Sequence, residues 1–182
     1  ELSLPAWYSS ILLVTVAGLM LLCSRLERQL ERQTSLGWLI LGLGFVYMSF
    51  DEMSVIHELF GRLTGDFPDF FGFLSFRWVI VGIPIVIVVA IGFLPFLRRL
   101  PAPTRIRLIL AGTIYVAGAI GLEMIGARLR TILGPEHWAY VLTANVEETL
   151  EILGVTLAFR AVVLHLAALP GGATIRLSQQ HG

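Results

Sequence analysis

The chain has 182 residues, of which 56% are hydrophobic and only 14% are charged, and its mean hydropathy is +0.81. A soluble domain usually carries about a quarter charged residues, so this composition excludes an ordinary soluble protein. The 13 basic residues balance the 13 acidic residues, which leaves no electrostatic reason to bind nucleic acid. We therefore predict an all-α integral membrane protein, a bundle of about five transmembrane helices in a lipid bilayer.

A helix that crosses a bilayer needs ~20 mostly apolar residues. The chain offers such stretches at about 5–24, 36–58, 77–97, 106–126 and 138–165. Residues 1–169 are predicted to form a single transmembrane domain, followed by a flexible C-terminal tail at 170–182. The first apolar run is too long for a typical signal-peptide core, so we keep it as a helix. Because the chain starts at Glu1 rather than Met, we expect further residues before it.

Arginines in the short loops predict how the chain is oriented. They are concentrated after the first span, within the stretch RLERQLERQ at 25–33, and after the third span, at 98–107. These loops are expected to face the cytoplasm of a bacterial inner membrane, with the N-terminus outside and the C-terminus inside. We interpret the stretch at 25–33 as a short helical extension with solvated charges, and His165 as a residue of the inner interface.

Acidic side chains lie within the second, fourth and fifth spans, whereas the first and third spans have no internal charge. With the predicted orientation, Asp51, Glu123, Glu147 and Glu151 all fall in the outer half of the bilayer. At ~100° per residue, Asp51 shares a helical stripe with Glu58, and Glu147 shares one with Glu151. Because a charge facing lipid costs a few kcal/mol, we expect these stripes to face each other and line a carboxylate pocket. The first and third spans would pack outside it.

Three interpretations of this pocket stay open. The acids can form a purely structural network with arginines on the same side, such as Arg77, Arg128 and Arg130. They can share protons, as carboxyls in a transport or relay site do, because neighbouring carboxylates resist full ionisation. They can also bind a divalent metal, since carboxylates with imidazole suit Zn, Mn or Fe. The predicted metal ligands are Asp51, His57, Glu58, Glu123, Glu147 and Glu151. His57 lies ~120° from the Asp51 stripe, so it would join only with a local distortion.

Familiar catalytic patterns are missing from the sequence. It contains no Glu-x-x-His pair of the di-iron carboxylate type and no His-Glu-x-x-His zinc motif. A phosphate loop and a dinucleotide fingerprint are also absent. The lone Cys23 rules out a disulfide within the chain and a cysteine metal site. Whether the chain catalyses a reaction stays undecided at this point.

Three segments carry a resemblance to a known family: FDEMSVIHE at 50–58, YVAGAIGLEMIGARL at 115–129 and NVEETLEILGVTLAF at 145–159. The chain resembles a family of small bacterial multi-pass membrane proteins of unknown function, with a DExxxxHE segment and an EExxExxG helix. The resemblance covers about 36–165. It implies a multi-pass membrane fold, but it carries no activity over to this chain.

The leading functional hypothesis is an integral membrane protein whose outward-facing carboxylate pocket binds a cation or a metal ion. The first alternative is an accessory subunit of a larger respiratory or photosynthetic membrane complex, since short loops leave little soluble surface. The second is a metal-dependent membrane hydrolase or oxidase, with a carboxylate as general base. The third is a proton-coupled carrier of small solutes. The expected partners are the lipid bilayer and either subunits of such a complex or further copies of the chain.

Overall fold

The computed structural model describes residues 4–54, 56 and 72–170. These ranges are helical and contain no strand. The elements are α1 (Leu4–Gln29), α2 (Ser35–Ser54), α4 (Trp78–Arg99), α5 (Ala102–Val116), the π-helix η1 (Ala117–Leu122), α6 (Glu123–Leu133) and α7 (Trp138–Ala167). Five helical stretches are long and apolar enough to cross a membrane, which confirms the predicted fold class. The end of the predicted second span, at 55 and 57–58, lies outside the described residues.

The fourth span is longer than the sequence predicted. Helices α5, η1 and α6 run on as one stretch of 32 residues, Ala102–Leu133, instead of ending near 126. The helix stops at Gly134, whose φ of 91° is a conformation that glycine adopts without strain. At a rise of 1.5 Å per residue the stretch is about 48 Å long, which exceeds a hydrocarbon core of about 30 Å. Glu123 therefore lies well inside the helix rather than near its end.

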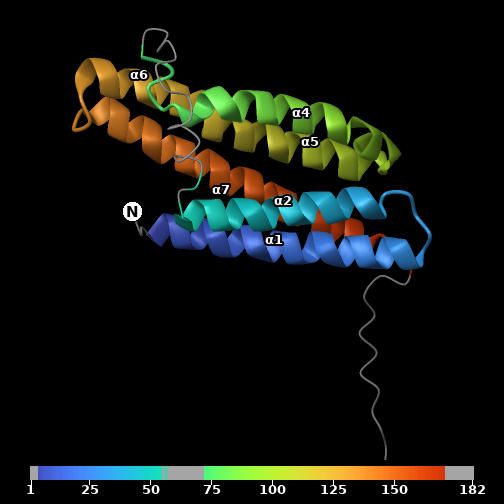
Figure 1. Cartoon of the computed structure of the whole chain (residues 1–182). Helices are drawn as coiled ribbons and strands as arrows, with labels where there is room; N and C mark the ends of the chain where they lie inside the picture. The colour runs from blue at the N-terminus through green and yellow to red at the C-terminus, as the bar shows by residue number, and fades with distance from the viewer. Residues whose placement is uncertain (1–3, 55, 57–71, 171–182) are drawn as a thin grey trace, which may run out of the picture.

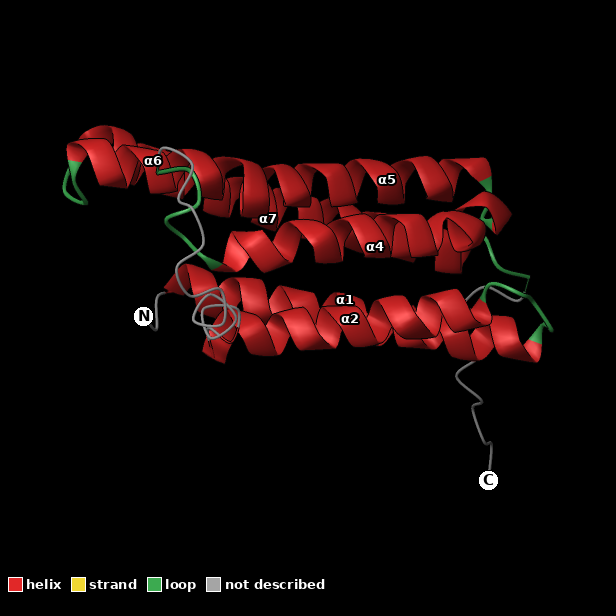
Figure 2. Cartoon of the chain, turned by 45° about the horizontal axis from the view of Figure 1, so that its top comes forward, coloured by secondary structure: helices red, strands yellow, loops and turns green. Residues whose placement is uncertain are grey.

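Helix α7 packs against α1 and against the continuous α5–η1–α6 stretch, and α1 packs along α2 (Figures 1 and 2). Helix α4 contacts η1. The core follows this arrangement, because Leu13, Val16 and Met20 of α1 are fully buried against α7 residues such as Val162. The first span was expected to pack outside the carboxylate pocket, and it supplies no residue of the acidic cluster. Its apolar face supplies a large part of the core, although it carries no charge inside the bilayer.

Hydroxyl side chains fasten α1 to α2 at both ends. Near one end, the Ser10 and Ser49 hydroxyls lie 2.9 Å apart and each also donates to the other residue's carbonyl oxygen. At the other end, the Ser24 hydroxyl donates to the Ser35 carbonyl at 2.7 Å. Small polar residues of this kind let membrane helices approach closely while their hydroxyls stay hydrogen-bonded.

Two glycines let α7 approach the α5–η1 helix. A Cβ atom at Gly154 would lie 2.8 Å from the backbone nitrogen of Tyr115, and one at Gly118 would lie 3.0 Å from the Glu147 carbonyl oxygen. Both positions therefore have room for a hydrogen atom but not for a methyl group. The close contact places Tyr115 and η1 directly against the part of α7 that carries Glu147 and Glu151.

Helix α4 is the least buried of the spans, as expected for a helix on the outside. Most of its side chains are exposed, and Val79 and Phe96 are the buried ones within it. Phe96 anchors its C-terminal end by packing edge-on against Trp38 of α2, with the ring centroids 5.3 Å apart. The rest of α4 presents a broad apolar surface suited to lipid.

Substitution of Gly154 tests the close contact between α5 and α7. Gly154→Ala is expected to lower the free energy of unfolding by about 1–3 kcal/mol, because the added methyl group meets the Tyr115 backbone. Gly112→Ala is the matched control on α5, since a methyl group added there would have no neighbouring atom within 4 Å. Thermal unfolding in mild detergent measures the stability of both variants. Equal midpoints for the two variants would contradict the contact.

Candidate functional site

Acidic side chains of α2, α6 and α7 lie in the same part of the structure, and we call Asp51, Glu52, Glu123, Glu147 and Glu151 the acidic cluster. Glu123 of α6 and Glu147 of α7 lie within electrostatic range of each other. The indole nitrogen of Trp78 donates to Glu123 at 3.4 Å. That these acids line one pocket, as the helical stripes predicted, stays a prediction.

Tyr115 of α5 lies among the carboxylates of two different helices. It is within electrostatic range of Glu151 and Glu147 on α7 and of Asp51 and Glu52 on α2. The tyrosine therefore joins the α2 acids to those of α7. The sequence patterns did not single out Tyr115, although it lies eight residues before Glu123 on the same span, and the YVAGAIGLE segment contains both.

Glu123 and Glu147 lie close enough to affect each other's ionisation. Neighbouring carboxylates in a low-dielectric site resist ionising together, which favours a proton on one of them. Both residues lie about 15 Å from the end of their helices nearest the α6–α7 turn, at 1.5 Å per residue. The π-helical turn η1 comes immediately before Glu123, and such turns are frequent at functional sites.

The predicted metal site gains no support from the described residues. Among them, no group of three histidine, cysteine, aspartate or glutamate side chains is placed to hold one ion. Of the six predicted ligands, His57 and Glu58 lie outside the described residues, and the other four belong to the acidic cluster. The metal site and its Zn, Mn or Fe occupant therefore stay a prediction.

Arginines near the acidic cluster make aromatic contacts. The guanidinium of Arg128 lies over the ring of Phe73 at 5.0 Å, and that of Arg130 lies over Phe76 at 5.5 Å. Cation–π contacts of this kind attach the end of α6 to the segment before α4.

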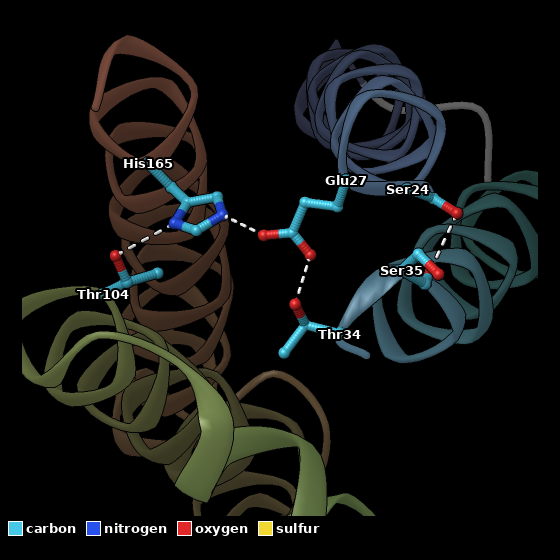
Figure 3. A network of polar contacts seen from close by, with 6 residues as sticks. All are labelled: Ser24, Glu27, Thr34, Ser35, Thr104 and His165. Carbon is cyan, nitrogen blue, oxygen red and sulfur yellow. Dashed lines mark hydrogen bonds and ion pairs between the residues drawn. The ribbon is translucent and has the colours of Figure 1, made fainter. Parts of the chain in front are cut away.

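A second polar centre lies at the opposite end of the bundle, among the loop arginines (Figure 3). His165 Nε2 on α7 lies 2.8 Å from a carboxylate oxygen of Glu27 on α1, and its Nδ1 lies 3.3 Å from the Thr104 hydroxyl on α5. The Thr34 hydroxyl donates to the other oxygen of Glu27. We call these four residues the Glu27 network. Glu27 is only 1% exposed and His165 only 2%.

No sequence pattern indicated this network. The helical extension of α1 was predicted correctly, but its charges were expected to be solvated and His165 was expected at the interface. Both expectations were wrong for Glu27 and His165, because α1 and α7 pack against each other and bury the two side chains between them. One signal was available: Glu27 and His165 lie near the ends of spans that the arginine pattern assigns to the same membrane face.

Trp38 completes the surroundings of the network. Its ring packs against the His165 imidazole, with centroids 4.9 Å apart. The Trp38 side chain is fully buried, and its indole nitrogen has no hydrogen-bond partner of normal geometry within the described chain. The ring thus closes the network off from the apolar core of α1 and α2.

A family model described as "Domain of unknown function (DUF8692)" matches residues 1–166, which include nearly all of the five candidate spans. The chain belongs to this family. No curated protein and no solved structure matches it. The resemblance to a multi-pass family of unknown function is therefore confirmed at this level, while its two sequence motifs stay a prediction. Both the acidic cluster and the Glu27 network lie inside the DUF8692 region.

Removing one member of the Glu27 network should destabilise this DUF8692 protein strongly. Glu27→Leu or His165→Leu leaves a polar partner buried and unpaired, which typically costs about 3–5 kcal/mol. The double variant should lose much less than the sum of the two, because neither the carboxylate nor the imidazole then stays buried without its partner and only the Thr34 and Thr104 hydroxyls lose theirs. Glu31→Leu is the control, since Glu31 is exposed. Unfolding in detergent measures the free energy of unfolding of all four variants. If the losses of the two single variants add up to that of the double variant, the pairing of Glu27 with His165 is contradicted.

Proposed function

We propose that this protein binds a cation at the acidic cluster, and that a proton is the cation held in the arrangement seen here. The proximity of Glu123 and Glu147 is the observation that supports it, because neighbouring carboxyl groups in a low-dielectric site resist ionising together and favour retention of a proton. The acids lie at membrane depth, where an ionisable group usually marks an ion or proton pathway.

A proton fits this geometry better than a metal ion does. Divalent metals need several ligand atoms converging on one point, and the described residues offer no such group. A protonated carboxyl pair instead needs only two side chains from facing helices. A metal-bound form stays the second version of the proposal, with His57 and Glu58 supplying ligands in addition to Asp51, Glu147 and Glu151.

Among the alternative functions, a proton-coupled carrier is the one that a protonatable cluster favours. The buried face of α7 limits how such a carrier could move protons. Between Glu151 and His165, α7 buries only Gly154, Val155, Ala158, Ala161 and Val162 over about 21 Å. A stretch without polar side chains does not relay protons. Transport would therefore require the helices to move, with protonation of the cluster as the trigger.

The surface of α4 favours a second candidate, an accessory subunit. Ile85, Val88 and Ile91 belong to a broad exposed apolar face, and the helix is anchored chiefly near Phe96. Such a face suits a neighbouring membrane protein as well as lipid. No observation within the described residues favours the metal-dependent hydrolase or oxidase.

Infrared spectroscopy of the purified protein tests the proton-binding proposal. Wild type is expected to show a carboxylic acid carbonyl band at neutral pH that shifts in D₂O. Glu147→Gln and Glu123→Gln should each remove the band. Glu148→Gln is the matched control, because Glu148 is the neighbour of Glu147 but is exposed. A spectrum without a protonated carboxyl band in wild type would overturn the proposal.

Elemental analysis separates the proton from the metal version. Protein purified without chelator is expected to carry well under one transition metal per chain. Near-stoichiometric metal that the Asp51→Asn, Glu147→Gln double variant loses would instead support the metal version. Metal that is equally present in that variant and in wild type would indicate binding elsewhere.

A further inference from the structure

Two adjoining cavities lie at the end of the bundle opposite the acidic cluster. One has a volume of about 300 Å³ and the other of about 200 Å³. Arg32, in the loop between α1 and α2, and Pro101, between α4 and α5, line both of them. The larger volume falls at the lower limit of small-molecule sites in proteins.

The larger cavity brings together groups that recognise phosphate. Arg32 and Arg107 supply guanidinium groups from two different segments, and the buried Thr104 and His165 side chains form part of the wall. Arginine binds phosphate through paired hydrogen bonds from its planar guanidinium. Arg99 lines the smaller cavity next to Arg32, which places a third cation nearby.

The arginines of the two cavities are available to pair with a ligand. Within the described residues, no carboxylate forms an ion pair with Arg32, Arg99 or Arg107. Glu27 lines the smaller cavity and opposes an anion, but both of its oxygens are occupied by His165 and Thr34. The three arginines therefore outweigh one carboxylate that already has its partners.

Helix α5 adds to the attraction of an anion. It begins at Ala102, and Pro101, Pro103 and Thr104 at its start line the larger cavity. No side chain caps this N-terminus, but Pro103 has no N–H and the Arg105 N–H donates to Pro101, so only the N–H groups of Ala102 and Thr104 and the positive end of the helix dipole stay available. This effect supports the arginines and does not replace them.

We propose that the larger cavity binds a phosphate group, held chiefly by Arg32 and Arg107. The phosphate can belong to an anionic lipid headgroup or to a free phosphate ion. The lipid source has additional support, because Leu164 and Leu169 form an apolar wall beside the cations. Basic pockets between transmembrane helices at the membrane surface bind such headgroups. The site is independent of the acidic cluster, which lies at the other end of the bundle.

Thermal unfolding of delipidated protein in mild detergent tests the proposal with three probes at equal ionic strength. The probes are short-chain phosphatidylglycerol, inorganic phosphate, and diacylglycerol, which lacks the phosphate. We expect phosphatidylglycerol to raise the unfolding temperature in a saturable manner and diacylglycerol to leave it unchanged. Arg32→Gln and Arg107→Gln should each weaken the apparent affinity by about fivefold or more.

Arg28→Gln is the matched control, because Arg28 is exposed on α1 close to Arg32 and lines neither cavity. It should bind like wild type. Stabilisation by inorganic phosphate equal to that by the lipid would assign the site to free phosphate, and stabilisation by the lipid alone would assign it to a headgroup. The proposal is overturned if neither phosphate probe stabilises wild type. It is also overturned if Arg28→Gln weakens binding as much as Arg107→Gln, which would indicate diffuse charge.

Discussion

A bilayer core offers no water, so each polar group that a helix carries into it must find a partner inside the bundle. This constraint accounts for most of the contacts that join the helices. Ser10 pairs with Ser49 across α1 and α2, and His165 pairs with Glu27 across α7 and α1. Glu123 of α6 and Glu147 of α7 lie within electrostatic range of each other. Apolar faces alone would let each helix pack at several rotations about its own axis, and these polar pairs favour one rotation.

Helix α7 is common to both polar centres, because it carries Glu147 and Glu151 toward one end and His165 toward the other. The buried residues between them are small or aliphatic. The two centres are therefore separate in the arrangement described, and a change at one reaches the other only if α7 or its neighbours move. The proposed functions of the two ends can accordingly be tested one at a time.

Small residues decide how closely the helices that carry the acidic cluster can approach each other. Gly118 and Gly154 bring the α5–η1 helix against α7, and this contact places Tyr115 among carboxylates from two helices. The π-helical turn lies at the same place, directly before Glu123. The tight contact lies beside the half-buried acids Glu147 and Glu151, whereas α4, which supplies Trp78, is packed less tightly.

The sequence by itself determined the five spans, because hydropathy is a property of single helices. It did not determine which helices are neighbours. The first span was expected outside the carboxylate pocket, and no pattern indicated that its apolar face packs on α7. That neighbourhood buries Glu27 and His165, two residues 138 positions apart whose pairing no local pattern could indicate. Only the tertiary structure decided this, because burial depends on what another helix covers.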